Sequence, residues 1–318
     1  RQAIATKVED LYGRQTDATT EVTVCDGATE GLFSAIQAVV HPGDEVIVFD
    51  PAYDSYDPAV ALAGGRTLHI PLTTTDTNPE FHIDWDRLRD TISDRTRLII
   101  VNFPHNPTGA ILSASDLDNL ADIVRDTDVY LLSDEVYEHI VFDGHEHQSL
   151  LRHSELRSRT FVVSSFGKTY HATGWKVGYC VAPPALTTEF RKIHQWVCYA
   201  VITPVQHALA DYMTTHPEHY NELPLFYEQK RDQFCELLSS SHFTIRPTRG
   251  TFFQMLDYSG ITDEHDADYA KRLTREIGVA SIPVSVFCEQ PLDRQLLRFC
   301  FAKDDSILEE AAARLCQL

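Results

Sequence analysis

Short apolar runs rich in β-branched residues alternate with amphipathic stretches over the first two thirds of the chain, and this alternation constrains the fold more than any other feature. Several runs are apolar at consecutive positions, which is typical of strands that helices cover on both faces. Strands are predicted at residues 21–25, 45–49, 67–72, 97–102, 129–133, 160–165 and 177–182. Helices are predicted between them at residues 29–40, 53–62, 85–92, 113–125 and 186–196, with Ser113 as an N-cap. The pattern predicts an α/β domain with a mostly parallel seven-stranded sheet.

The character of the sequence changes after about residue 205. Long helical segments at 205–215 and 220–239 lead to strand-like runs at 243–246, 251–257, 280–283 and 297–301, with helices at 267–277 and from Asp305 onward. This mixture is typical of a small α+β domain. We therefore predict a large domain over residues 1–205 and a smaller one over residues 206–318.

The charge balance excludes several classes of partner. Asp and Glu number 47 against 27 Lys and Arg, which gives a formal net charge of −20, so nucleic acids and anionic membrane surfaces are not expected partners. No apolar run reaches the length of a membrane span. The seven cysteines are scattered and never form a C-x-x-C pattern, so we expect reduced thiols in a cytoplasmic protein.

Lys168 follows an apolar strand and precedes a turn that contains glycine and tryptophan. Burial disfavours an ammonium group, so a lysine at such a strand end would have a lowered pKa and act as an amine nucleophile. The alternative is a lysine that extends to the surface, and judged alone that interpretation is the better one. Polar residues at the ends of other strands favour the nucleophile instead, because open α/β sheets bind ligands beyond the carboxyl ends of their strands.

Asp134 and Asn106 are two such residues. Asp134 ends an apolar strand, where a carboxylate requires a cation such as a protonated pyridine nitrogen; its alternative role is a helix N-cap. Asn106, in a loop fixed by two prolines and a glycine, and Tyr137 could hydrogen-bond a ring phenolate oxygen. For both, ordinary structural hydrogen bonding is the alternative.

An anionic group could be bound by the turn before the second predicted helix. Ala28 and Thr29 offer backbone amides at a helix start, and Ser165 and Lys176 could add a hydroxyl and a positive charge. Tyr53 could stack on an aromatic ring, although an aromatic residue there could also be core. Together with Lys168, these residues would suit an aromatic aldehyde that carries a phosphate.

Arg298 lies between apolar residues that would bury it beside an anion. Its guanidinium could hold a substrate carboxylate through two parallel hydrogen bonds, and an internal salt bridge is the alternative.

The histidines give weaker signals. His139, His145 and His147 cluster near Glu146 without a zinc-binding spacing, so a solvated loop is expected. His105 and His171 flank the candidate motifs and are candidates for contact with a substrate.

Six motifs occur in an order that resembles the class I aminotransferases, which are fold-type I enzymes dependent on pyridoxal 5′-phosphate (PLP). The motifs are Gly-Ala-Thr at 27–29, Pro-Ala-Tyr at 51–53, Asn-Pro-Thr-Gly at 106–109, Ser-Asp-Glu-Val-Tyr at 133–137, Ser-Ser-Phe-Gly-Lys-Thr at 164–169 and Leu-Arg-Phe-Cys-Phe at 297–301. Residues 167–178 and 298–303 look like the kynurenine and glutamine transaminase branch, and most like its bacterial methionine aminotransferases. The resemblance implies PLP as cofactor, bound as a Schiff base to Lys168, and a homodimer with shared sites. It gives Asp134, Asn106, Tyr137, Tyr53, Ser165, Lys176 and Arg298 the roles argued above.

Two departures from the family bear on function. The family's N-terminal segment, which closes over the substrate, has no counterpart here, and we expect further residues before Arg1. Aspartate-type members bind the second substrate carboxylate with an arginine from the region that here is 199–203, where no cation is present. The sequence thus favours an amino acid with a large apolar side chain, such as methionine or an aromatic one, as amino donor to a 2-oxo acid. A C–S β-lyase acting on cysteine conjugates and a non-catalytic PLP-binding regulatory domain are the alternatives.

Overall fold

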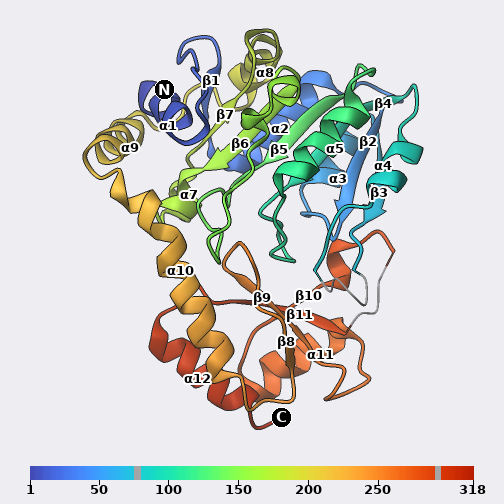
Figure 1. The fold of residues 1–318 in the computed structure, drawn as a ribbon, viewed down its shortest axis with the longest axis vertical. Coiled ribbons are helices and arrows are strands. Elements are labelled where there is room, and N and C mark those ends of the chain that lie inside the picture. The colour runs from blue at the N-terminus through green and yellow to red at the C-terminus, as the bar shows by residue number, and fades with distance from the viewer. Residues whose placement is uncertain (75–79, 291–294) are drawn as a thin grey trace.

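The computed structural model describes residues 1–74, 80–290 and 295–318. Its larger sheet has seven strands in the order β1-β7-β6-β5-β4-β2-β3 (Figure 1). The strands are β1 (Val22–Cys25), β2 (Glu45–Asp50), β3 (Arg66–Pro71), β4 (Thr96–Asn102), β5 (Tyr130–Asp134), β6 (Thr160–Ser165) and β7 (Gly178–Val181). Neighbours from β3 to β6 pair in parallel, and only β7 runs antiparallel to its neighbours β1 and β6. The predicted seven-stranded, mostly parallel sheet is confirmed.

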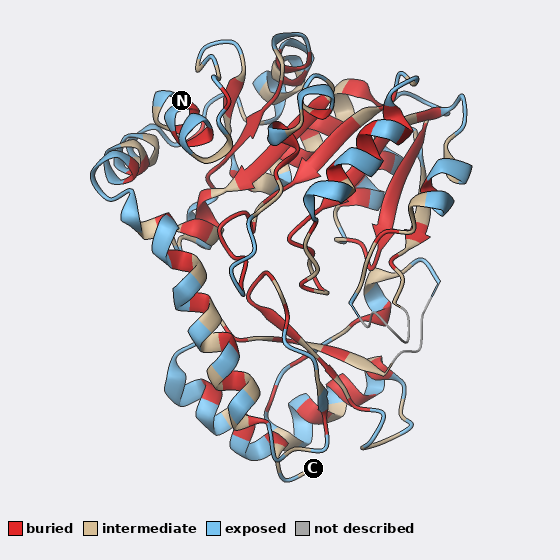
Figure 2. Cartoon of the chain, in the orientation of Figure 1, coloured by how far each residue is buried: buried red, intermediate tan, exposed pale blue. Residues whose placement is uncertain are grey.

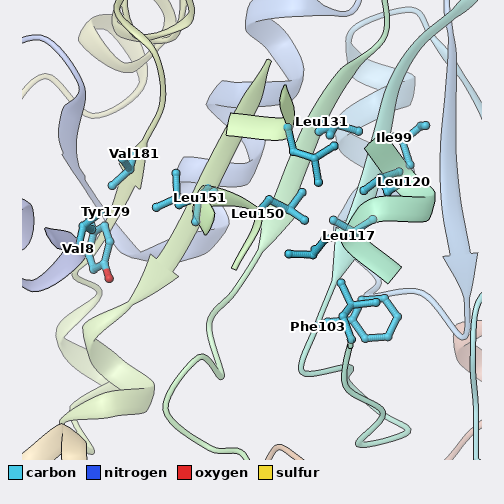
Figure 3. Packing of buried hydrophobic residues seen from close by; sticks show 14 of the residues in the cluster. Val8, Ile99, Phe103, Leu117, Leu120, Leu131, Leu150, Leu151, Tyr179 and Val181 are labelled. Carbon is cyan, nitrogen blue, oxygen red and sulfur yellow. The ribbon is translucent and has the colours of Figure 1, made fainter. Parts of the chain in front are cut away.

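Both faces of this sheet are buried, which explains the consecutive apolar positions. In β4, Ile99 and Val101 belong to one core cluster and Leu98 and Ile100 to another. Ile99 packs with Leu117 and Leu120 of α5 (Ala114–Val124) on the first face (Figure 3). On the opposite face lie α2 (Gly27–Val39), α3 (Tyr56–Leu62) and α8 (Pro184–Val197).

Three further helices lie around the large sheet: α1 (Gln2–Tyr12), α4 (Trp85–Thr91) and α6 (Ser154–Arg157). Ser113 is the N-cap of α5, as predicted, and its side chain accepts a hydrogen bond from the Asp116 amide in a capping box. The helix predicted from residue 53 begins only at Tyr56. A turn at residues 54–55 precedes it, and the Ala52 amide before that turn donates to the Phe287 carbonyl at 2.6 Å.

A second, four-stranded antiparallel sheet has the order β10-β11-β9-β8. Its strands are β8 (Thr244–Ile245), β9 (Phe253–Asp257), β10 (Ile282–Pro283) and β11 (Leu296–Cys300), and they pack with α10 (Glu218–Leu237), α11 (Asp266–Arg272) and α12 (Asp305–Leu315) around a separate core (Figure 2). The helix predicted at 267–277 is α-helical only to Arg272 and continues as a π-helical turn over Leu273–Ile277.

The helix α9 (Thr203–Thr215) packs beside α1, and α10 runs from it to the second sheet (Figure 1). Its Leu209 and Met213 belong to a core cluster of the large sheet, although the predicted division falls at residue 205. That division stays a prediction. In the described part of the chain, no helix has both the length and the apolar character that crossing a membrane requires.

Candidate active site

A cavity of about 540 Å³ lies beyond the carboxyl ends of β4, β5 and β6, where the second sheet faces the first. This size falls within the range of about 300–1,000 Å³ that is usual for small-molecule sites. The residues predicted to bind the cofactor or the substrate carboxylate all line this one cavity: Ala28, Thr29, Tyr53, Asn106, Asp134, Tyr137, Ser165, Lys168, Lys176 and Arg298. The structure therefore brings together residues that are up to 270 positions apart, from Ala28 to Arg298 (298 − 28).

Lys168 lies in α7 (Phe166–Thr169), the single helical turn that follows β6. Its ammonium nitrogen is 5.6 Å from the centroid of the Tyr137 ring and 5.3 Å from that of Phe252. Burial lowers the pKa of Lys168, while nearby Cys300 and Asp134 act in the opposite direction. The side chain is thus turned into the cavity and against aromatic rings, and its amine is easier to deprotonate than that of a surface lysine.

Asp134 is buried at the end of β5, and one carboxylate oxygen accepts a hydrogen bond of 2.7 Å from the Tyr56 hydroxyl. Burial raises the pKa of Asp134 to about 6, and the Tyr56 hydrogen bond limits that rise. A turn at residues 136–139, and not a helix, follows Asp134, so it is no helix N-cap, but its carboxylate does accept a hydrogen bond of 3.4 Å from the Val136 amide at the start of that turn. The sequence reasoning assigned no role to Tyr56. Its proximity to Asp134 depends on packing between segments 78 residues apart.

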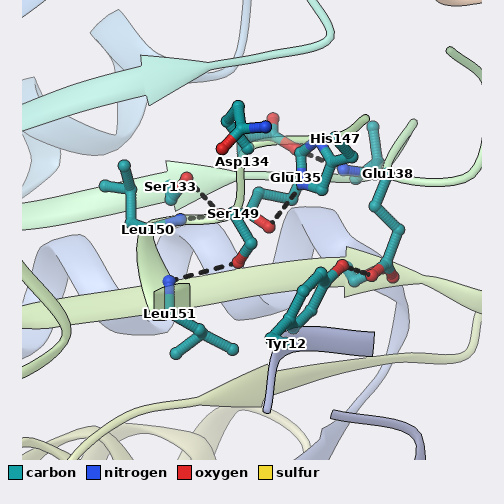
Figure 4. A network of polar contacts seen from close by, with 12 residues as sticks. Tyr12, Ser133, Asp134, Glu135, Glu138, His147, Ser149, Leu150 and Leu151 are labelled. Atoms are coloured by element: carbon teal, nitrogen blue, oxygen red, sulfur yellow. Dashed lines mark hydrogen bonds and ion pairs between the residues drawn. The ribbon is translucent and has the colours of Figure 1, made fainter. Parts of the chain in front are cut away.

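Two further buried carboxylates, Glu135 and Glu138, hold the turn at residues 136–139 that carries Tyr137 (Figure 4). Glu135 accepts hydrogen bonds from the Ser133 hydroxyl at 2.8 Å and the Leu150 amide at 3.1 Å. Glu138 accepts one of 2.7 Å from the Lys7 ammonium. Burial opposes ionisation of Glu138, but Lys7 holds its pKa well below the ordinary value.

These buried contacts tie the turn to α1 and to residues 149–151. Lys7 and Glu138 carried no signal in the sequence beyond their charge. Their pairing spans 131 positions and therefore depends on the fold.

The Gly-Ala-Thr turn and Lys176 form the cationic end of the cavity. The helix α2 begins at Gly27, two residues earlier than predicted, so the amides of Ala28 and Thr29 belong to its first turn and have no acceptor within the helix. Gly27 has a φ of 75°, and a Cβ placed on it would lie 3.1 Å from the Lys176 ammonium. Amides and ammonium thus surround the same space, which suits a phosphate.

Arg298 and Asn106 form the opposite side of the cavity. The Arg298 guanidinium donates to the Asn106 side-chain oxygen at 2.6 Å and lies 4.1 Å from the centroid of the Phe253 ring and 5.1 Å from that of Phe287. Within residues 1–74, 80–290 and 295–318, Arg298 forms no ion pair, so the internal salt bridge that was its alternative is not found there. The stacked, partly buried guanidinium can therefore receive a carboxylate.

The histidines lie away from the cavity lining. His147 contacts Glu135 at 2.8 Å, and the three histidines form no metal-ligand group among the described residues. The solvated loop expected here holds for the exposed His145 but is wrong for His139 and His147, whose side chains are 7% and 9% exposed. His105 is buried with its pKa lowered to about 3, and His171 contacts the Tyr227 hydroxyl at 3.1 Å. Neither of these two residues, which had been candidates for substrate contact, borders the cavity.

The sequence reasoning missed an apolar wall of the cavity, formed by Ile282, Val286 and Phe287. Ile282 and Val286 are 40% and 59% exposed, so they form the rim rather than the core. Their sequence, a short run with proline and serine, resembles any connection between strands, and only the contact between the two sheets brings it to the site.

Comparison with known proteins decides the family. The family model for aminotransferases of class I and II matches residues 1–315. The chain belongs to the class I and II aminotransferase family. It is 50% identical to the methionine aminotransferase of Escherichia coli, over all of this chain and 81% of that protein. It is 36% identical to mouse kynurenine–oxoglutarate transaminase 3, over 95% of this chain and 72% of that protein.

Solved structures agree with this assignment. A crystal structure of an E. coli protein identified as a methionine aminotransferase superposes with a TM-score of 0.97, covering all of this chain and 82% of the other at 50% identity. The structure of N-succinyldiaminopimelate aminotransferase from Mycobacterium tuberculosis superposes with a TM-score of 0.95 at 36% identity. The match covers 99% of this chain and 82% of the other. The predicted fold and the predicted resemblance are both confirmed. The chain is an aminotransferase, and the alternative of a non-catalytic regulatory domain is not supported.

Proposed function

We propose that this aminotransferase binds PLP in the cavity and transfers the amino group of a methionine-like or aromatic amino acid to a 2-oxo acid. The observation that carries the proposal is the convergence of Asp134, Lys168, Lys176 and Arg298 on one cavity. Each matches a different part of the reacting system: a ring nitrogen, an aldehyde, a phosphate and a substrate carboxylate. The relationship to a methionine aminotransferase over the whole chain supports the choice of substrate.

The donor set fits the proposed cofactor. Asp134, held by Tyr56, would pair with the pyridine nitrogen, and Asn106 and Tyr137 would hydrogen-bond the ring oxygen. Tyr53 would lie against the ring. The amides of Ala28 and Thr29, the Ser165 hydroxyl and the Lys176 ammonium would bind the phosphate. Lys168 is the lining lysine that remains for the aldehyde.

When bound, PLP supplies an electron sink that stabilises the carbanion left by removal of the proton from the substrate Cα. Arg298 holds the substrate carboxylate and so orients the Cα–H bond for deprotonation. Lys168 acts as general base on that proton, and its lowered pKa favours the neutral amine that this step requires. Ionised Asp134 keeps a proton on the ring nitrogen beside it.

The cavity favours an apolar substrate side chain. Its cationic lining residues are Lys168, Lys176 and Arg298, and each already has a role, so no cation among the described lining residues remains for a second carboxylate. Ile282, Val286 and Phe287 instead offer an apolar surface to the substrate side chain. A methionine thioether or an aromatic ring would gain from contact with that surface.

We also propose a cytoplasmic homodimer. Large apolar side chains are exposed around the end of α8, with Trp196 83%, Val197 50%, Tyr199 81% and Ile202 55% exposed. Exposed apolar side chains that follow one another this closely in the chain suggest a protein interface. Cys25 and Cys180 are buried free thiols, which agrees with a reducing compartment. Light scattering of the purified protein would measure its mass, and a monomer at micromolar concentration would contradict the dimer.

The test of the cofactor is a visible spectrum before and after borohydride, followed by peptide mapping. The proposal expects a yellow protein whose reduced label lies on Lys168, and a label on any other residue would contradict the assignment. For the reaction, the enzyme is incubated with methionine and a 2-oxo acid. Formation of a new amino acid supports transamination. Pyruvate and ammonia released from a cysteine conjugate, with no new amino acid from any pair, would show a C–S lyase instead.

A further inference from the structure

Glu30, His194 and Cys198 bring three potential metal ligands together on the outer side of the cofactor loop. One carboxylate oxygen, one imidazole nitrogen and the sulfur all lie within 4.8 Å of one another. Among the residues that the structure describes, no other group of three His, Cys, Asp or Glu side chains brings its ligand atoms this close together. None of the three lines the cavity, so the proposed transamination does not use them.

The local structure holds these groups on facing helices. His194 and Cys198 are four positions apart at the end of α8, where the Cys198 amide donates to the His194 carbonyl at 3.0 Å, so their side chains share one face of the helix. Glu30 lies in the first turn of α2, which packs against α8. Its carboxylate accepts a hydrogen bond of 2.6 Å from the Ser34 hydroxyl and one of 3.1 Å from the Asp26 amide.

Glu30 and His194 are largely buried and in direct contact. The side chains of Glu30 and His194 are only 8% and 13% exposed, and the imidazole lies 3.1 Å from the carboxylate. His194 is the only ion-pair partner of Glu30 within the described ranges, and a histidine is charged only when protonated. The carboxylate, the imidazole and the thiol thus present one oxygen, one nitrogen and one sulfur to the same small space.

The types of ligand atom in the cluster indicate which cation it would bind. Sulfur together with nitrogen excludes the hard cations Mg²⁺ and Ca²⁺, which prefer oxygen ligands, and favours Zn²⁺. Zinc bonds of about 2.0–2.3 Å in a tetrahedron place neighbouring ligand atoms about 3.3–3.8 Å apart. The carboxylate oxygen and the imidazole nitrogen are 3.1 Å apart, in hydrogen-bond contact, so an ion would replace this hydrogen bond and separate the two atoms slightly. The sulfur, which lies within 4.8 Å of both, would approach. Cys198 is the C-cap of α8, a position where a small movement breaks no interior helix bond.

We propose that Glu30, His194 and Cys198 form a binding site for a zinc-class divalent cation that joins α2 to α8 behind the Gly-Ala-Thr turn. The ion would take three protein ligands and leave the fourth position to water. Cys198 would bind as a thiolate, and its proton would pass to solvent. Because Glu30 also accepts from the Asp26 amide next to Gly27, the ion would share a ligand with the cofactor loop without touching the cofactor.

The first test uses the untagged holoenzyme after treatment with a chelator and desalting under a non-thiol reductant. Calorimetric titration with Zn²⁺ should show one ion per chain. Co²⁺ should give the intense long-wavelength bands of a tetrahedral site, beyond the absorption of the cofactor. Cys198→Ser and His194→Gln should each weaken Zn²⁺ binding by about 10- to 100-fold or more, because even outer-shell partners of a metal contribute that much. Cys316→Ser, which changes a partly buried thiol in the second sheet's layer, should leave binding unchanged.

Binding that survives Cys198→Ser unaltered would overturn the site, as would the absence of stoichiometric binding. If a variant does not fold, the unmodified chain still decides. The thiolate that alkylation requires is the same group that binds the ion, so Zn²⁺ should slow alkylation of the partly exposed Cys198 by about 10-fold or more, while Cys316 in the same sample reacts at its usual rate. Equal alkylation of Cys198 with and without Zn²⁺ would refute the proposal.

Discussion

The floor and the rim of the cavity differ in how firmly their side chains are held. The floor comprises Asn106, Asp134 and Lys168 at the carboxyl ends of the parallel strands, and the rim comprises Ile282, Val286 and Phe287. Asp134 is 3% exposed and hydrogen-bonded, whereas Val286 is 59% exposed. The buried, hydrogen-bonded Asp134 keeps its part of the floor in one geometry, and Asn106 and Lys168 are partly buried beside it, while an exposed apolar rim can change without disturbing the fold.

This difference suggests a division of function. The floor determines which bond reacts, and the rim determines which substrate side chain is accepted. The rim is still attached to the floor's sheet, since the Ala52 amide donates to the Phe287 carbonyl at 2.6 Å and the Glu289 amide to Asp50 at 2.9 Å. Substitutions in the floor should therefore lower turnover for all substrates, and substitutions in the rim should change the preference among them.

The largest effect is expected from Lys168→Ala. The variant loses both the amine for the cofactor and the general base, and proton transfer alone contributes about 10²- to 10⁴-fold, so kcat should fall by about 10⁴-fold or more. Steady-state kinetics with methionine as amino donor measure this fall in kcat. Lys192→Ala, at an exposed lysine of α8, is the matched control and should keep full activity. A Lys168→Ala enzyme within 10-fold of the parent would refute the assigned role.

Arg298→Gln should produce the next largest effect, and one that depends on the substrate's carboxylate. Removing one partner of a desolvated charge pair costs about 2–5 kcal/mol, so kcat/KM for methionine should fall by about 30-fold or more. Arg298→Lys should be intermediate, because an ammonium cannot form the two-pronged contact. The corresponding amine without a carboxylate, 3-(methylthio)propylamine, should be affected far less. An equal loss for both compounds would mean that Arg298 acts on structure and not on the carboxylate.

The sequence was sufficient for most of the floor. Strands covered on both faces have unbroken apolar runs, as in 97–102, and ligand sites in such sheets lie beyond the strand ends. These two rules are enough to predict from the sequence alone that Asn106, Asp134 and Lys168 lie together. The resemblance to aminotransferases then supplied their roles.

What the sequence did not reveal depends on contacts between distant segments. Tyr56 was assigned to a helix and Glu138 to no function, yet Tyr56 binds Asp134 and Glu138 anchors the turn beside it. The rim was missed for the same reason, because β10 has only two residues and its position follows from pairing with β11. Local propensity carries no information on such pairings.

Tyr56→Phe should shift a pH profile rather than abolish activity. The buried Asp134, with a pKa raised to about 6, must be ionised to pair with a protonated ring nitrogen, so PLP affinity of the apoenzyme should fall as the pH drops through about 6. Loss of a hydrogen bond to a charged group costs about 1.5–3 kcal/mol, which raises that pKa by about one unit or more. The midpoint for the variant should therefore lie above pH 6, with affinities converging at alkaline pH. Titration of apoenzyme with PLP by fluorescence measures this. Tyr130→Phe, at the other end of β5, is the control, and an unmoved midpoint in Tyr56→Phe would show that this hydroxyl does not tune Asp134.

The smallest effect is expected at the rim. Val286→Arg adds a cation at the rim that could bind the second carboxylate of aspartate. An exposed ion pair contributes at most about 1 kcal/mol, so the ratio of kcat/KM for aspartate to kcat/KM for methionine should rise by no more than about 5-fold. Val286→Gln controls for size and polarity without charge. Added salt should reduce the gain, because the contact is exposed to solvent. Turnover of methionine at saturation should stay near the parent value in both variants. A fall in kcat as large as that of Lys168→Ala would mean that rim and floor form one unit, and the division between chemistry and substrate choice would be wrong.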